Sequence, residues 1–352
     1  MHPVHGGGAL CHHTLRSRED TVKPIITLSL ATALGLGAGV AAAATIDEVC
    51  EAGAAEPSLI WYSSQDPSRN EAAIAAFKSA YPDIEIEGFR LSTGKLAIRY
   101  ASERDAGVVN ADLISLADPN FIADGFAKDW FVKIEKSELP ALAELDDKWF
   151  DGGSATTSIS MLGFGYNTDL VGDNPPKSWE DLMRPDFKGK IILGDPRNVP
   201  SYMALFRILR EKYGDDFLEG VASQEPVVVP SVVPATQQLA AGEVTVVIPS
   251  VMTTLRVLMI DGAPIDFVAP ELTTGNEFET ILSQGADSPN AARCFMNFLF
   301  TEAGQQAYNG PTSVSPLANI SDTAPMPSDY IDPRIPELSE HSAEIVKLLG
   351  LQ

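Results

Sequence analysis

The chain has 352 residues, of which 45% are hydrophobic and 21% are charged. This composition is typical of a folded globular protein large enough for two lobes, and it argues against a disordered or fibrous chain. The formal net charge of −23 repels nucleic acid and anionic lipid headgroups, which argues against nucleic acid and anionic membrane surfaces as partners.

The N-terminal region has the pattern of a secretory leader. An apolar run rich in small residues covers 24–44, directly after Lys23, and its last four alanines offer an A-x-A cleavage site. We therefore predict a signal peptide within 1–44 and an exported protein. A membrane anchor is the competing interpretation, but the run is rich in Gly and Ala and ends in a cleavage pattern. Because 1–22 is long and polar for a leader, we expect the true start near Val22.

In the first half of the chain, short apolar strands alternate with amphipathic helices, which predicts an α/β fold. Strands are expected at 58–62, 84–89 and 111–117. A helix should follow each strand, and it should begin at Asp66-Pro67, at Ser92 or Thr93, and at Asp118-Pro119.

A long strand-forming segment, 154–170, then carries the chain from one lobe to the other, and Ser178 opens a capping box. The second half repeats the βα pattern. Its expected elements are strands at 190–194, 226–230 and 244–249, each followed by a helix, then a return strand at 264–270, a helix pair at 288–308, a loop-like tail at 321–335 and a last helix at 337–350. We predict an α/β fold with two lobes, in which lobe one comprises 45–155 plus 266–310 and lobe two comprises 156–265 plus 311–352.

Hydroxyl-bearing turns recur at the expected strand ends in both halves. In open α/β sheets ligands bind outside the carboxyl ends of strands, where helix N-termini favour anions. For any single Ser or Thr, helix capping is the more common explanation, but the set as a whole predicts a ligand cleft. The candidate ligand-binding residues are Ser63, Ser64, Gln65, Ser92, Thr93, Lys95, Arg197, Asn198, Ser201, Tyr202, Ser250 and Thr253. Arg197 is the preferred counter-charge for an anion, with Lys95 second.

Catalysis and metal binding are poorly supported by the residues present. After the leader, His341 is the one histidine left, so Ser-His-Asp catalysis and multi-histidine metal sites are improbable. We predict a protein that is not an enzyme and has no cofactor and no bound metal; a secreted hydrolase that uses acidic residues stays as an alternative. Cys50 and Cys294 form an even pair that suggests a disulfide in an exported protein, although two separate buried thiols are also possible.

Five stretches of the chain carry a family resemblance: "LIWYSSQ", "ADLISLADPNFIADGFAKDW", "GFGYNTDLVGDNPPKSWEDLMRPDFKGKIILGDP", "QLAAGEVTVVIPS" and "SPNAARCFMNFLFTEAGQQAY". In this order they resemble the periplasmic substrate-binding proteins of ABC importers, most closely the branch of ferric-iron, spermidine/putrescine or phosphonate type. The resemblance implies the two-lobed periplasmic-binding-protein fold (type II), in which two α/β lobes are joined by hinge strands and hold a ligand between them. It also implies export to the periplasm and a permease in the inner membrane as partner. We expect a monomer.

The resemblance also bears on the ligand. The iron-binding members hold ferric ion with two adjacent tyrosines at the start of the helix after the "AGE" strand, and here 249–254 reads Pro-Ser-Val-Met-Thr-Thr. Hydroxyl groups of Ser and Thr are poor ligands for ferric ion but suit an anion at a helix N-terminus. We therefore expect a small organic anion, such as a phosphonate or a carboxylate, with ferric ion as the alternative.

Overall fold

The computed structural model describes residues 44–335 and 338–351. The predicted signal peptide, apart from Ala44, lies outside the described residues. Within the described ranges, no helix combines the length and apolar character that crossing a membrane requires.

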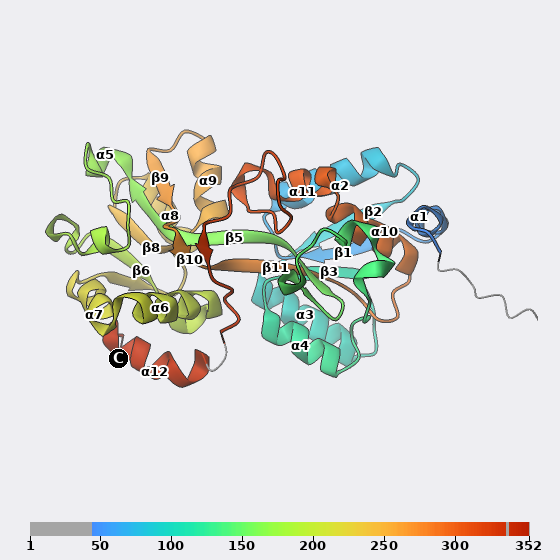
Figure 1. Ribbon diagram of the computed structural model, residues 1–352, viewed down its shortest axis with the longest axis horizontal. Helices are drawn as coiled ribbons and strands as arrows, with labels where there is room; N and C mark the ends of the chain where they lie inside the picture. The colour runs from blue at the N-terminus through green and yellow to red at the C-terminus, as the bar shows by residue number, and fades with distance from the viewer. Residues whose placement is uncertain (1–43, 336–337, 352) are drawn as a thin grey trace, which may run out of the picture. The chain divides into compact units, whose positions relative to one another are not determined.

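The first half of the described chain follows the predicted βα alternation (Figure 1). Its elements are α1 (Ile46–Gly53), β1 (Leu59–Ser63), α2 (Pro67–Ala80), β2 (Ile86–Arg90), α3 (Thr93–Asp105), β3 (Leu113–Leu116) and α4 (Pro119–Ala127). The predicted helix starts are confirmed: the Asp66 carboxylate accepts the N–H of Ser68, and the Asp118 carboxylate accepts the N–H of Phe121. Helix α1 was not predicted.

Two long antiparallel strands, β5 (Ser154–Asn167) and β11 (Gly275–Leu282), connect the two halves of the sheet (Figure 1). The first part of β5 pairs with β11, whereas its second part pairs with β8 (Val246–Val251) and β9 (Ile265–Val268). With β6 (Ile191–Gly194) and β7 (Val227–Val229), the strand order is β2-β1-β3-β11-β5-β8-β6-β7, and β9 and β4 (Phe150–Asp151) also pair with β5. Strand β5 matches the predicted long strand, but β11 was missed.

The second half contains the remaining βα units. They are α5 (Thr168–Val171), β6 (Ile191–Gly194), α6 (Pro200–Tyr213), α7 (Asp215–Ser223), β7 (Val227–Val229), α8 (Val232–Ala240) and α9 (Met252–Ile260). One boundary was wrong: β8 continues through Val251, so Ser250 lies within the strand and Val251 is the N-cap of α9. Half of the predicted capping box at Ser178 forms, because Asp181 accepts the N–H of Ser178 at 3.0 Å, ahead of a short 3-10 segment.

The C-terminal part supplies α10 (Pro289–Leu299), α11 (Glu302–Asn309), the two-stranded pair β10 (Leu272–Thr273) and β12 (Asp329–Tyr330), and α12 (Leu338–Leu348). The predicted helix pair and last helix are confirmed. The 3-10 segments in the described ranges are η1 (Lys136–Glu138), η2 (Pro140–Leu142), η3 (Asp147–Trp149), η4 (Glu180–Met183), η5 (Pro185–Phe187), η6 (Pro196–Asn198) and η7 (Gly310–Thr312).

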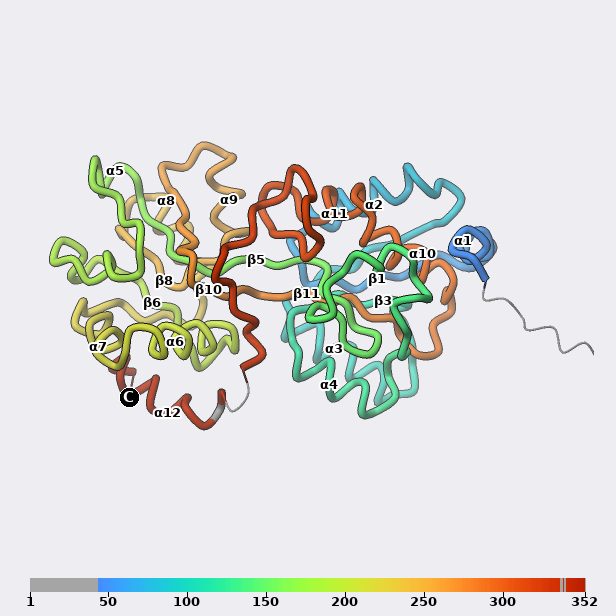
Figure 2. The backbone as a smooth tube through the Cα atoms, viewed as in Figure 1, coloured from blue at the N-terminus to red at the C-terminus, as the bar shows by residue number. Residues whose placement is uncertain are grey.

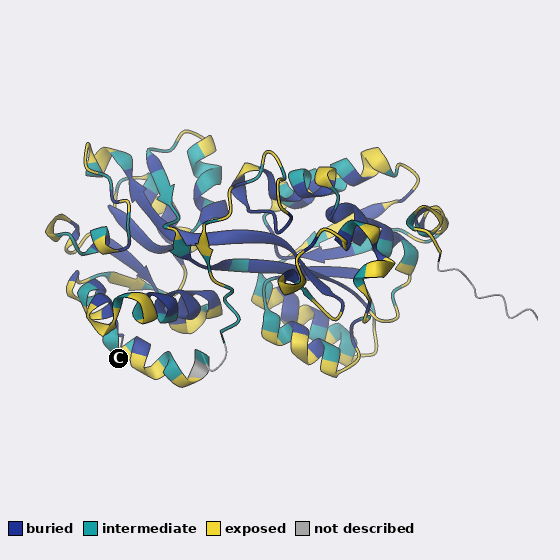
Figure 3. Ribbon diagram, viewed as in Figure 1, coloured by how far each residue is buried: buried dark blue, intermediate teal, exposed yellow. Residues whose placement is uncertain are grey.

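Buried residues form separate clusters toward the two ends of the long strands, as Figure 3 shows by burial. On one side, Trp61, Phe77 and Phe295 pack between the sheet and α2, α10 and α11, and a smaller cluster around Tyr100 lies under α3 and α4. On the other side, Phe164 packs against Trp179 within the cluster that includes α6, α8 and α12. We call these parts lobe one and lobe two. The first cluster also takes in Val314, Leu317 and Ala324, and the exact lobe boundaries stay a prediction.

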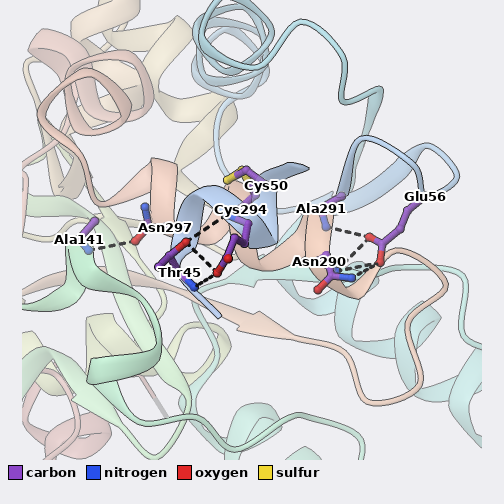
Figure 4. The surroundings of a disulfide bond; sticks show 9 residues. Thr45, Cys50, Glu56, Ala141, Asn290, Ala291, Cys294 and Asn297 are labelled. Carbon is purple, nitrogen blue, oxygen red and sulfur yellow. Dashed lines mark hydrogen bonds between the residues drawn. A yellow bond between two sulfur atoms is a disulfide. The ribbon is translucent and has the colours of Figure 1, made fainter. Parts of the chain in front are cut away.

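The two cysteines that follow the leader form a disulfide between α1 and α10, with a Cα–Cα distance of 5.1 Å (Figure 4). The helices lie in close contact there, because a Cβ on Gly53 would meet the backbone nitrogen of Ala291 at 2.8 Å. The Glu56 carboxylate accepts the N–H groups of Asn290 and Ala291 and so caps α10 from the α1–β1 connection.

Gly163, in the middle of β5, leaves no room for a side chain. A Cβ at this position would lie 2.0 Å from the carbonyl oxygen of Val268 on β9. We expect Gly163→Ala to lower the free energy of unfolding by at least about 2 kcal/mol, since the backbone of β9 must move. Urea unfolding checks this. The control is Gly94→Ala in α3, where no atom lies within 4 Å, and where alanine should stabilise the helix by up to about 1 kcal/mol. Equal effects of the two substitutions would contradict the argument.

Candidate functional site

A cavity of about 1100 Å³ lies between the two lobes. Lobe one supplies the first turns of α4, and lobe two supplies η6, the start of α6 and α12. Both contributing helix starts follow strands of the sheet, since α4 comes after β3 and α6 comes after β6. The lining residues are Pro119, Asn120, Ile122, Ala123, Phe126, Asp151, Ser154, Pro196, Arg197, Asn198, Pro200, Met203, Glu279, Pro333, Arg334, Ile335, Leu338, Ser342, Ala343 and Val346.

A smaller cavity of about 70 Å³ lies beside strand β11 and shares lining residues with the larger one. Its lobe-one wall is Ala117 and Pro119, at the carboxyl end of β3, and its lobe-two wall is 199–201 at the start of α6. Strand β11 lines it with Gly275, Asn276, Glu277 and Glu279, and Pro333 and Arg334 contribute from the C-terminal segment. The carboxyl end of a lobe-one strand thus faces a helix start of lobe two, as expected for ligand sites in α/β sheets.

Two buried glutamates of β11, Glu277 and Glu279, meet Arg334 beside these cavities. The guanidinium lies 3.4 Å from Glu277 and 3.9 Å from Glu279, and Asp332 holds it with three contacts of 2.6–3.1 Å. The Glu277 carboxylate also accepts a hydrogen bond from the hydroxyl of Tyr330 at 2.6 Å. We call Glu277, Glu279, Tyr330, Asp332 and Arg334 the hinge cluster.

Burial changes the ionisation of the glutamates in the hinge cluster. It raises the pKa of Glu277 to about 8, helped by the negative charge of Asp332 and opposed by the hydrogen bond from Tyr330. Burial also raises the pKa of Glu279, opposed by its hydrogen bond from Ser154. Both side chains therefore favour the uncharged form at neutral pH more than ordinary glutamates do.

Three of the predicted site residues line the interlobe cavities: Arg197 and Asn198 line the larger one, and Ser201 lines the smaller one. Arg197 is held by Asp195 at 2.7–3.0 Å and donates to the carbonyl of Leu351 at 2.9 Å. This pairing lowers the pKa of Asp195. The Ser201 hydroxyl donates to the Asn276 side chain at 2.6 Å, so the start of α6 contacts strand β11 directly.

The predicted lobe-one residues line neither interlobe cavity, and four of them form hydrogen bonds within the protein. Ser63 donates to Asn70 at 2.9 Å, Thr93 donates to Ser64 at 3.0 Å, and the Gln65 amide donates to Ser158 at 2.7 Å. Ser92 and Lys95 are exposed at the start of α3. A role for these five residues and Lys95 in ligand binding stays a prediction.

The three other predicted lobe-two residues point into the protein. Tyr202 is 5% exposed within the core of lobe two, and burial raises its pKa. Ser250 donates to the carbonyl of Val247 at 2.9 Å, and Thr253 shares a hydrogen bond with Ser160 of β5. The structure therefore explains these side chains by packing and local hydrogen bonding, and a contact with ligand stays a prediction.

The sequence analysis missed Asn120, Glu277, Glu279 and Arg334. A short signal for the glutamates was present, because in "GNEFETIL" (275–282) they are two residues apart, with Phe278 between them. That pattern predicts a strand with both glutamates on one face. Nothing comparable marks Arg334, which lies in a proline-rich loop. Across the residues that the structure describes, no group of three or more His, Cys, Asp or Glu side chains is arranged to hold a metal ion.

Comparison with known proteins places the chain in a family. A family model described as "Bacterial extracellular solute-binding protein" matches 109–333, more than half of the chain. An uncharacterized protein of Haemophilus influenzae is 26% identical over 338 residues, which cover 91% of this chain and 92% of that protein.

Solved structures of similar fold include periplasmic binding proteins. One is AfuA from Actinobacillus pleuropneumoniae with exogenous fructose-6-phosphate bound (22% identity, TM-score 0.60, 83% of this chain and 96% of that chain). Another is iron-bound HitA from Pseudomonas aeruginosa (18% identity, TM-score 0.63, 84% of this chain and 99% of that chain). These likenesses confirm the predicted two-lobed α/β fold. Together with the family match, they show that this chain belongs to the bacterial extracellular solute-binding proteins.

Proposed function

We propose that the chain is the solute-binding component of an ABC importer, which captures a small ligand between its lobes and delivers it to a membrane permease. The observation that carries this proposal is the interlobe cavity of about 1100 Å³, whose opposite walls belong to different lobes. A ligand in this space contacts both walls fully only when the lobes approach one another. Its extra contacts then favour the closed state, as in other proteins with hinged lobes.

We propose a small organic anion as the ligand, such as a phosphonate, a carboxylate or a sugar phosphate. Two guanidinium groups, of Arg197 and Arg334, line the cavity, while the raised pKa of Glu279 favours its uncharged form. The relative AfuA was solved with a sugar phosphate bound, which supports the same class. Ferric ion is the alternative, since HitA was solved with iron, but 249–254 of this chain has no tyrosine to bind it.

A thermal-shift screen tests the proposal. A ligand that binds only the folded protein raises the melting temperature, and at 100 times its Kd it adds about 2.7 kcal/mol of stability. We expect a rise with at least one phosphonate, carboxylate or sugar phosphate, and none with polyamines. A rise with ferric citrate together with a visible charge-transfer band would instead support iron. No rise with any small solute would count against the solute-binding function itself.

Bulky residues at the cavity mouth should abolish binding of the ligand that the screen identifies. Asn120 and Asn198 are exposed and line the cavity from opposite lobes. We expect Asn120→Trp with Asn198→Trp to weaken binding at least tenfold in calorimetry, while the melting temperature without ligand stays within about 2 °C. Asn110→Trp is the matched control, because Asn110 is equally exposed but precedes β3, at the other end of the strand from Asn120. Unchanged affinity in the double variant would place the site elsewhere.

A further inference from the structure

The chain connects the two lobes a third time, in addition to β5 and β11. The segment 329–335 begins at β12, which pairs with β10, and the chain then supplies α12 (Figure 2). Helix α12 belongs to lobe two, since Ile345 is fully buried in the lobe-two cluster and Arg210 of α6 pairs with Glu344 at 2.8 Å. The segment therefore leads from β12 to α12, and α12 is fixed to lobe two.

On its other side, the same segment is attached to lobe one. The ring of Tyr330 lies 5.8 Å from that of Trp149, a buried residue of the lobe-one cluster. The Arg334 guanidinium donates to the carbonyl of Lys148 at 3.1 Å. Both contacts are made to η3, which precedes β5, so the segment touches lobe one just before the chain crosses to lobe two.

The segment also contacts strand β11, through the residues of the hinge cluster. Tyr330 makes a close hydrogen bond to Glu277, whereas Arg334 approaches Glu277 and Glu279 only at 3.4 and 3.9 Å. The Arg334 side chain is 26% exposed, and one oxygen of Glu277 is buried with no hydrogen-bond partner. The ion pairs of Arg334 with the two glutamates are thus the longest polar contacts of the segment, whereas its pair with Asp332, inside the segment, measures 2.6 Å. Arg334 and Glu279 line both interlobe cavities, and Glu277 lines the smaller one.

We propose that 329–335 is an interlobe strap and that Arg334 is its latch, a residue that holds the lobes in the described arrangement through Glu277, Glu279 and the Lys148 carbonyl. When the lobes rotate about β5 and β11, a strap fixed to η3 at one end and to α12 at the other has to change one of its contacts. The contacts of Arg334 to the two glutamates yield first because they are long and the guanidinium is partly exposed to solvent. This inference rests on the lobe movement of the proposed function.

The test measures the distance between the lobes without any ligand. Spin labels are attached to Glu71→Cys on α2 and Asp216→Cys on α7, both exposed positions, in a chain whose Cys11 is replaced by Ser so that the disulfide stays intact. We expect one narrow distance distribution for this parent protein. Arg334→Met keeps the length of the side chain but removes its charge, and it should at least double the width of the distribution or shift its maximum.

Two further proteins make the test decisive. Arg293→Met is the matched control, because Arg293 is also 26% exposed and pairs with Glu138 at 3.4 Å, but within lobe one; its distribution should equal that of the parent. The pair Glu277→Gln and Glu279→Gln is compared with the parent at pH 9, where the Glu277 carboxylate, with a pKa of about 8, is ionised. There it removes charged partners of the latch and should reproduce the effect of Arg334→Met even if that variant folds poorly. A parent-like distribution in either latch variant overturns the strap. Failure of every solute to change the parent distribution would count against the proposed function instead.

Discussion

Replacing Cys50 and Cys294 with alanine is expected to lower the free energy of unfolding by about 3–5 kcal/mol. The disulfide joins residues 244 positions apart, so its loss frees a very long loop in the unfolded chain. It also fixes α1, a helix of eight residues that has few other long-range attachments than its contact with α10. For a domain of this size the expected fall in melting temperature is roughly 5–10 °C.

The measurement is thermal or urea unfolding of the oxidised protein, the reduced protein and the cysteine variants. Each single variant should be destabilised about as much as the double variant, since either substitution removes the whole cross-link. A reducing agent should lower the melting temperature of the wild type and leave the double variant unchanged. Additive effects of the two single substitutions would mean that packing of the side chains, rather than the cross-link, provides the stability.

Local signals in the sequence predicted most of the fold. Asp66-Pro67 and Asp118-Pro119 combine a capping side chain with a proline that fits the first helical turn, and both helices begin there. Strand β11 was missed because its sequence, "GNEFETIL", places two acidic residues in a strand that pairs on both sides. Glutamate disfavours such a position, and only the distant Arg334, Ser154 and Tyr330 make it tolerable.

The candidate site was predicted less well than the fold, for a related reason. Ser and Thr at strand ends satisfy local backbone and side-chain partners first, as the bonds from Ser250 to Val247 and from Ser63 to Asn70 show. Sequence patterns identify such turns but not the direction in which a hydroxyl points. The residues that line the interlobe space, such as Asn120 and Arg334, are brought together by the packing of distant segments, which no local pattern records.

The second large expected effect is on the pH dependence of stability, through Glu277. Its pKa is about 8 in the folded protein and 4.5 as an ordinary glutamate, so between these pH values the unfolded chain releases a proton that the folded protein keeps. Stability contributed at this residue is therefore full below pH 4.5 and falls as the pH rises to 8, by on the order of 4 kcal/mol. The groups that face Glu277 are Tyr330, Asp332, Arg334 and Glu279.

Glu277→Gln should remove this loss. Glutamine keeps the shape of the side chain and an oxygen that accepts the Tyr330 hydroxyl, but it has no proton to release. Urea unfolding at a series of pH values should give nearly equal stabilities for variant and wild type at pH 5 and a more stable variant at pH 8.5. Glu87→Gln, on the exposed face of β2, is the control and should run parallel to the wild type at every pH. A constant difference between Glu277→Gln and wild type from pH 5 to 9 would show that Glu277 ionises as an ordinary glutamate. The carboxylate of Glu277 would then be exposed to water in the folded protein rather than buried in the hinge cluster.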